Sequence, residues 1–425
     1  MKAAQLRFVI FVAMGMFVFQ SESGWVSSLK FVYFPLVVLF GVISLGNLRY
    51  LDPSMKRALK PALVGLSILL VFITGVAFIS IIRGEEPLRV FRDFFTYLLI
   101  CIAPIVAVDA GRVTSLRSGK ALAASFTGVA AVSFSVYWLS ARGVSLLGVD
   151  RLLMFSMVLT GLGILLGSVY GLVRLRPTWV LFGILCFIAI LVTGTRSGFI
   201  LLLGVFGAVG AVRKFRIPVF RFAVGMIGIA VCTYLVLPVI SSRVSKEGFL
   251  ENRIRALGEI FGDGVTSDAS GAIRSRAVDI TRAEWRDRPL LGVGFGHAFE
   301  SPVPGRVAVD FQLDSGMLLF AKFGVLGMLC LMVSFALIGF CIVRFHRAIG
   351  ARSEAQALGT AFLFMCSLIA FLGAPTEDKG FAYGLSIVLF LLVVHGRAAH
   401  GMRASKLGTT VCTPRACLVS ESVTR

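Results

Sequence analysis

The chain has 425 residues, of which 57% are hydrophobic and only 15% are charged, and its mean hydropathy is +0.91. A soluble domain carries roughly 25% charged residues, whereas apolar runs long enough to cross a bilayer recur here from end to end. The composition therefore excludes a water-soluble enzyme and a disordered or fibrous chain. It predicts a polytopic membrane protein.

The apolar runs predict an all-α fold, a polytopic membrane helix bundle of about twelve spans with one large extracytoplasmic loop that contains short helices. A polar tail follows the last span. The spans are expected at about 6–20, 31–46, 61–82, 94–108, 121–139, 152–172, 178–194, 197–211, 222–239, 315–343, 356–372 and 380–395.

The net charge of +20 follows from the expected topology. With a cytoplasmic N-terminus, the inner segments hold 23 of the 42 basic residues and four of the 22 acidic residues. This excess is what the positive-inside rule describes, so no nucleic-acid partner is needed to explain it. Both termini are then cytoplasmic. The chain divides into spans one to nine (1–239), the large loop (240–312), spans ten to twelve (313–396) and a cytoplasmic tail (397–425).

Arg196 lies at the outer membrane boundary, in a very short hairpin (193–199) that joins two apolar spans. A guanidinium presents a planar fork of donors that matches phosphate oxygens, and the N-terminus of the next helix adds free amides and a positive dipole end. Both features favour an anion clamp for a phosphate-bearing ligand. The alternative is a snorkelling arginine that bonds lipid headgroups or caps helix C-termini.

The large loop is predicted to contain a helix at 273–288, which stops at Pro289, and a tight, flexible turn at the glycine-rich segment 292–296. This segment lacks the preceding strand and the Lys-Ser ending of a nucleotide-binding loop. Disorder is not expected, because the loop contains apolar side chains that can be buried, namely Ile280, Trp285, Phe295 and Phe299.

The predicted loop helix carries five arginines and no lysine, namely Arg274, Arg276, Arg282, Arg286 and Arg288. Arginine is preferred where phosphate is bound through two hydrogen bonds, whereas lysine would serve equally well for solubility. Because Arg274 and Arg282 are eight residues apart, they lie on nearly one face of the helix. The alternative is a solvated helix with Glu284–Arg288 and Asp279–Arg282 ion pairs, which we favour for Arg286 and Arg288.

Several side chains on the outer side are candidates for proton transfer, namely Glu284, His297, Asp310, Asp314, Glu377 and Asp378. Asp314 stands where the loop re-enters the membrane, and partial desolvation there makes a carboxylate a stronger base. The alternative is a helix N-cap, since Asp followed by Ser-Gly is common at a helix start. His297 and Glu284 are the other candidate bases. No Asp-x-Asp pair or His/carboxylate cluster in the sequence indicates a metal, so neither metal nor cofactor is expected.

Four features, taken in order, resemble the O-antigen ligase/polymerase superfamily. They are the Thr-Arg-Ser-Gly hairpin (195–198), the arginine-rich loop helix, the segment 289–296 and the span that opens at 314–318. The twelve-span topology with one large, late loop is also similar. The resemblance implies a metal-independent membrane glycosyltransferase of the C type in the bacterial inner membrane. Such enzymes take a glycan from an undecaprenyl-diphosphate carrier in the periplasm and use arginines to bind the diphosphate.

The resemblance also implies roles for particular residues. Arg196 matches the family's hairpin arginine, and Arg274 or Arg276 matches a second arginine on the loop helix, so we expect these three and Arg282 to bind the diphosphate. In the ligase branch a His-Asn pair opens the span after the loop, and its histidine is held to be the base. This chain has Leu-Asp-Ser at 313–315, which departs from the ligase pattern and resembles the polymerase branch.

We therefore expect a polymerase of cell-surface polysaccharide, O-antigen or exopolysaccharide, which transfers glycan from undecaprenyl diphosphate to a lipid-linked repeat unit. The arginines neutralise the departing diphosphate, and Asp314, His297 or Glu284 deprotonates the acceptor hydroxyl. The bilayer, a chain-length regulator and a flippase are its expected partners. The alternatives are an O-antigen ligase with lipid A–core as acceptor and, more remotely, a polysaccharide or lipid transporter. The sequence lacks the internal symmetry typical of transporters.

Overall fold

The computed structural model describes residues 2–19, 25–140, 153–154, 156–172, 176–193, 269–303, 309–310, 313, 315–349, 353–372 and 379–410. Two predicted spans, 197–211 and 222–239, lie outside these residues. Arg196 and Asp314 lie outside them as well, so their predicted roles stay predictions.

The described part of the chain is almost entirely helical, as predicted, and every predicted span within it coincides with a helix. Six helices are long and apolar enough to cross a membrane, and three more are shorter and apolar. The six long helices are α2 (Trp25–Asn47, continued by the 3-10 helix η1, Leu48–Tyr50), α3 (Pro53–Ile82), α4 (Pro87–Val113), α5 (Leu116–Ser140), α12 (Leu318–Ile349) and α14 (Lys379–Thr410), and the three shorter ones are α1 (Ala3–Val18), α6 (Met157–Leu172) and α7 (Pro177–Thr193). The described part of the bundle also contains α13 (Ser353–Leu372).

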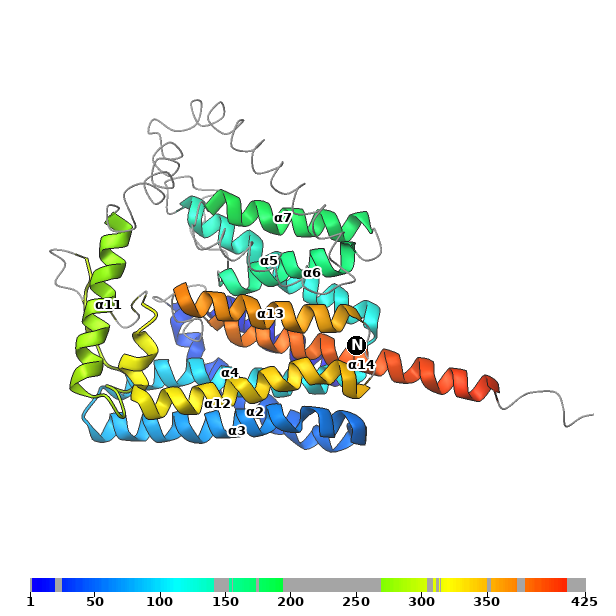
Figure 1. Cartoon of the computed structure of the whole chain (residues 1–425), viewed down its shortest axis with the longest axis horizontal. Coiled ribbons are helices and arrows are strands. Elements are labelled where there is room, and N and C mark those ends of the chain that lie inside the picture. Colours follow the sequence, from blue (N-terminus) through cyan, green and yellow to red (C-terminus); the bar gives the residue numbers. More distant parts are fainter. Residues whose placement is uncertain are drawn as a thin grey trace, which may run out of the picture.

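Helices α4 and α14 form the centre of the bundle. They pack along each other, α3 packs along α12 on one side, and α5, α6 and α7 group on the other side (Figure 1). The apolar stretches of α4 and α14 are buried almost throughout, whereas most of those in α3 and α12 face outward. Their outward side chains are apolar, such as Phe78 and Met332, as contact with lipid tails requires.

The predicted loop helix is present as α11 (Ala269–Asp287), and it lies across one end of the bundle (Figure 1). A small antiparallel pair follows it, formed by β1 (Phe299–Glu300) and β2 (Val309–Asp310). This pair was not predicted, because two-residue strands are too short to show an alternating pattern. Phe295 and Phe299 are fully buried, as expected for an ordered loop.

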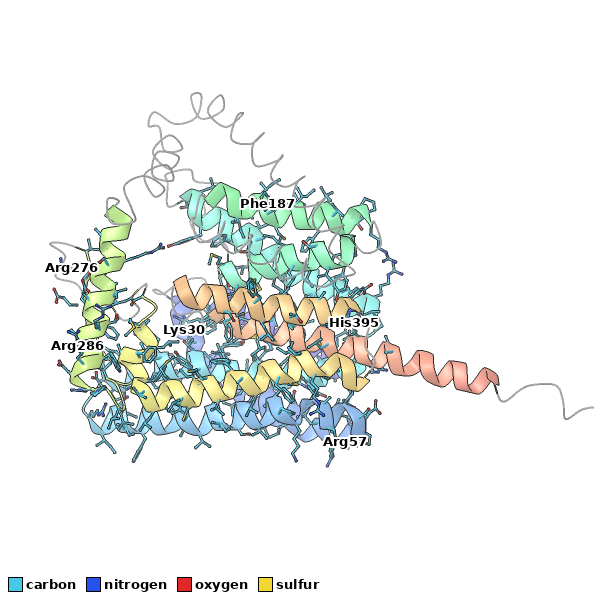
Figure 2. All side chains as sticks on the ribbon, viewed as in Figure 1. Lys30, Arg57, Phe187, Arg276, Arg286 and His395 are labelled. Carbon is cyan, nitrogen blue, oxygen red and sulfur yellow. The ribbon has the colours of Figure 1, made fainter. Side chains whose placement is uncertain are left out.

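The two ends of the bundle are chemically distinct. The end of the bundle that α11 crosses is called the α11 end below. The turn between α3 and α4 lies at this end, because Arg83 in that turn contacts the loop. Figure 2 places Arg276 at this end and Arg57 at the opposite end. A partly buried ion pair between Lys120 and Glu354 (3.2 Å) lies among the segments expected to be cytoplasmic. The α3–α4 turn and α11 thus share one end, as the predicted topology requires, and the side of the membrane that each end faces stays a prediction.

Candidate functional site

The glycine turn, residues 289–297, connects α11 to the strand β1 and lies against α3, α4 and α12. Gly292, Gly294 and Gly296 have φ angles of 65°, 94° and 78°, in the left-handed region that residues with side chains rarely adopt. Space is lacking as well, since a Cβ at Gly294 would lie 2.3 Å from the Ser80 hydroxyl oxygen. The predicted turn is therefore present, and its glycine segment is buried rather than loosely exposed.

Helix α12 is interrupted at Gly324, whose φ is 62°, and the glycine turn fills the break. The amides of 293–294 donate to the carbonyls of 321–322, both at 2.9 Å. In return, the amides of 325–326 donate to the carbonyls of 289–290, at 2.8 and 3.1 Å. The turn thus supplies the hydrogen-bond partners that an interrupted helix lacks at its new ends. Loop and helix are joined by main-chain bonds.

Side chains of α3 and the residue that follows it also hold the glycine turn. The Ser80 hydroxyl accepts a hydrogen bond from the Phe295 amide at 2.9 Å. The Arg83 guanidinium donates to the Gly292 carbonyl, also at 2.9 Å. The Phe295 ring is fully buried and packs against Tyr97 of α4. Because polar and apolar contacts act together, the turn has one defined position at the α11 end.

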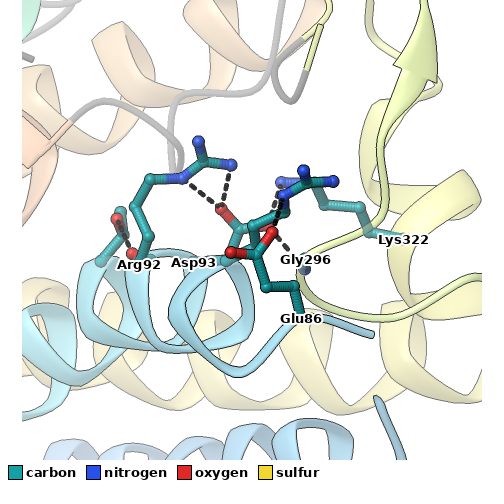
Figure 3. Close-up of polar contacts among 7 residues, drawn as sticks. Glu86, Arg92, Asp93, Gly296 and Lys322 are labelled. Carbon is teal, nitrogen blue, oxygen red and sulfur yellow. Dashed lines mark hydrogen bonds and ion pairs between the residues drawn. The ribbon is translucent and has the colours of Figure 1, made fainter. Parts of the chain in front are cut away.

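A buried ionic centre, called the Asp93 centre below, lies under the glycine turn (Figure 3). Asp93 of α4 accepts hydrogen bonds from the Gly296 amide at 3.1 Å and from the Arg92 guanidinium at 3.2 and 3.3 Å. Its second partner of opposite charge is Lys322 of α12, whose ammonium nitrogen lies 3.4 Å from the carboxylate. Both Asp93 and Lys322 are closed off from solvent.

His297 ends the glycine turn, and its ring lies between two carboxylates. The Nε2 atom is 3.3 Å from Glu284 of α11, and the Nδ1 atom is 3.5 Å from Glu85 of the turn between α3 and α4. Glu284 thus contacts His297 rather than its predicted partner Arg288. The side chains of all three residues are partly exposed. The Nε2 atom itself is buried and forms no hydrogen bond with a described residue, so the 3.3 Å to Glu284 is a close contact between the two groups. An imidazole this near a carboxylate can exchange a proton with it once the two groups align.

The arginines of α11 lie on the solvent-facing side of that helix. Arg274, Arg276 and Arg282 are all exposed, and Arg276 lies 3.3 Å from Glu300 of β1. The opposite face is buried through Ala277 and Thr281. The structure brings the three predicted loop arginines onto the helix that also carries Glu284.

The start of α12 bears on the role predicted for Asp314, although Asp314 itself lies outside the described residues. The hydroxyl of the next residue, Ser315, accepts a hydrogen bond from the Met317 amide at 3.1 Å. This is the bond of a helix N-cap. The same hydroxyl lies 2.9 Å from that of Thr281, which ties α11 to the start of α12. A cap at this helix start is therefore available without Asp314.

Three polar residues of the site were not singled out from the sequence, namely Glu85, Asp93 and Lys322. Lys322 had a visible signal, since it is a charge inside an otherwise apolar span and such charges are expensive in a membrane. Asp93 stands directly before the predicted span 94–108 and reads as an ordinary boundary residue. No group of three or more His, Cys, Asp or Glu side chains that could hold a metal ion occurs in the described part of the chain.

The fold and the site define a multi-pass helical membrane protein with a polar, arginine-bearing site at one end. The family model described as O-antigen ligase matches residues 181–332. The match confirms the predicted resemblance to the O-antigen ligase/polymerase superfamily, whose members have membrane-glycosyltransferase-like activity. It covers α11, the glycine turn and Lys322, whereas Glu85 and Asp93 lie before it. No curated protein matches the chain significantly.

Proposed function

We propose that this chain is a polymerase of cell-surface polysaccharide, of the O-antigen or exopolysaccharide type, in the bacterial inner membrane. The donor is a glycan on undecaprenyl diphosphate, and the acceptor is a lipid-linked repeat unit. The α11 end faces the periplasm, where the large loop covers the ends of the spans. The family match and the membrane helices support a glycosyltransferase of this kind.

The observation that carries the proposal is the position of the His297–Glu284 contact on the helix that bears the arginines. A hydroxyl oxygen of the acceptor attacks the anomeric carbon of the donor, and the bond from that carbon to the diphosphate breaks. The leaving undecaprenyl diphosphate takes the bonding electrons, and arginines stabilise the negative charge that it gains. A base takes the hydroxyl proton. Arg274, Arg276 and Arg282 of α11, together with Arg196, are the proposed diphosphate ligands.

We assign the base to the His297–Glu284 pair. The 3.3 Å between the imidazole and the carboxylate supports this choice, because the acceptor proton can pass to one group and be shared with the other. Asp314 is the rival base. The hydroxyl of Ser315 already accepts the hydrogen bond of a helix N-cap at the start of α12, and asparagine keeps the capping ability of aspartate. An Asp314→Asn variant therefore separates the two assignments of the base by activity.

The ligase is the second candidate, because the family model that matches residues 181–332 is that of O-antigen ligase. It uses the same donor but transfers the glycan to lipid A–core. The sequence Leu-Asp-Ser at 313–315, in place of the His-Asn pair of ligases, supports the polymerase. Both candidates use the same arginines, so the acceptor is what distinguishes them.

Surface-polysaccharide electrophoresis of a strain that lacks this chain tests the proposal. A polymerase predicts that only single repeat units remain on the cell surface, and that the wild-type chain restores long polymer. Arg196→Ala should fail to restore it although the protein reaches the membrane. Uncapped core with accumulated lipid-linked polymer would instead establish a ligase, and absence of any exported glycan would establish a transporter.

A further inference from the structure

The ion pair between Asp93 and Lys322 is fully buried. The Lys322 side chain is 0% exposed and that of Asp93 is 1% exposed. Removing two charges from water is costly, and an apolar pair of similar volume often stabilises a protein as well or better. Stability alone therefore does not account for a charged pair at this position, and an ionisable pair inside a membrane protein commonly marks a functional site.

The geometry of the Asp93 centre links this ion pair to His297. The carboxylate oxygen that Lys322 contacts also accepts the hydrogen bond of the Gly296 amide, at 3.1 Å. Gly296 directly precedes His297 in the chain. The other carboxylate oxygen is bound by Arg92 (Figure 3). Because both of its oxygens are bound, the Asp93 carboxylate is held in one orientation. It links α4, α12 and the glycine turn.

Other contacts hold earlier parts of the glycine turn. The carbonyls of 321–322 bind the amides of 293–294, and Ser80 binds the amide of Phe295. Asp93 is the last of these anchors along the chain before His297. A shift at Gly296 would move the imidazole away from Glu284, which α11 holds independently.

We propose that Asp93 is a positioning residue for the glycan transfer, and that Lys322 holds its carboxylate in place. Through the Gly296 amide, Asp93 fixes the backbone from which the imidazole of His297 projects. It thereby sets the separation of His297 and Glu284. This inference rests on the proposed function, because it takes that pair as the base.

The test compares two double variants that differ only in the hydrogen bond to Gly296. Removing Asp93 alone would take its carboxylate partner from the buried charge of Lys322 and endanger folding, so both variants carry Lys322→Met. Asp93→Asn keeps an oxygen that accepts the Gly296 hydrogen bond, whereas Asp93→Leu does not. Arg92, whose side chain is 40% exposed, can turn to solvent in both.

Polymer formation is measured in membranes at several concentrations of the undecaprenyl-diphosphate-linked repeat unit extracted from the deletion strain. The amount of folded protein is measured by size-exclusion chromatography in detergent. We expect kcat of Asp93→Leu/Lys322→Met to lie roughly 10- to 100-fold below that of Asp93→Asn/Lys322→Met, as for a displaced reacting group. The donor KM should be similar in both, since the arginines are untouched. Equal kcat values, or a difference confined to KM, would overturn the proposal.

A matched control uses the partly buried ion pair between Lys120 and Glu354, among the segments expected to be cytoplasmic. Lys120→Met/Glu354→Gln and Lys120→Met/Glu354→Leu should not differ in kcat, because this pair is far from His297. The His297→Gln variant distinguishes a failure of the positioning role from a failure of the proposed function. If wild-type membranes form polymer and His297→Gln keeps the full kcat, the positioning role and the assignment of the base to His297 both fail, while the polymerase activity stands. If wild-type membranes form no polymer from this donor, the proposed function itself fails.

Discussion

His297 meets carboxylates from two distant parts of the chain, Glu85 before α4 and Glu284 on α11. Glu284 and His297 were candidates for proton transfer from the sequence, and the structure brings them into contact. The arginines of the same helix are not equivalent for the proposed chemistry. Either Arg274 or Arg276 is predicted to match the second arginine of the family pattern, whereas Arg286 near the end of the helix is predicted to be a solvated charge.

Arg274→Ala is therefore expected to abolish polymer formation while the protein level stays normal. Arg274→Lys should restore little activity, because a single ammonium does not replace a fork that binds two phosphate oxygens. Arg286→Ala on the same helix is the matched control and should have a mild effect. The readout is long surface polymer on gels, with the amount of membrane-inserted protein measured in parallel. If Arg274→Lys kept full activity, a positive charge alone would account for the role of Arg274. That result would contradict bidentate binding of the diphosphate.

At the scale of elements, the sequence predicted the helices better than the contacts between them. Apolar runs of bilayer length set the spans, and Pro289 marked the end of α11. The interlock of the glycine turn with α12 was not predicted, because it joins two segments through main-chain groups that leave no side-chain pattern. The Asp93–Lys322 pair was not predicted for a related reason. Each charge is visible in the sequence, but only the three-dimensional structure shows that Asp93 of α4 and Lys322 of α12 meet.

The glycine turn makes a specific prediction about stability. Gly294→Ala should lower the melting temperature of the purified protein, because the new Cβ meets Ser80 at 2.3 Å and the φ of 94° is unfavourable for alanine. Strain of this kind costs about 1–3 kcal/mol. Gly75→Ala in α3 is the control, since a Cβ there would meet no atom within 4 Å and alanine is the better helix former. Equal melting temperatures for both variants would contradict the tight fit of the turn.

At the scale of the whole molecule, the positive-inside rule and the structure assign segments to the same two ends. The α3–α4 turn and α11 share one end, as the predicted topology requires. Which end faces the periplasm is a prediction from charge alone. Ser301 in the loop is buried, so it is a poor site for a labelling test, whereas Ser275 of α11 and Ser118 of α5 are both exposed.

Single cysteines at these two serines, with the native cysteines replaced, test the orientation. Ser275→Cys should react with a membrane-impermeant thiol reagent once the outer membrane is permeabilised. Ser118→Cys should stay protected until the inner membrane is broken, because the positive-inside rule places α5 residues near Lys120 in the cytoplasm. The reverse pattern would move the arginines and His297 to the cytoplasmic side, away from the proposed donor.

The interlock between the glycine turn and α12 also bears on how this protein can diversify. Its bonds run between main-chain amides and carbonyls, so they depend on backbone conformation and hardly on which side chains surround them. The glycines are constrained, while the exposed side chains of Leu290 and Leu291 are not needed for the attachment, in which Leu290 takes part through its carbonyl. Mutations can therefore alter the outer surface of the loop without detaching the loop from the membrane helices. On the proposed function, this surface is where an acceptor sugar would be selected.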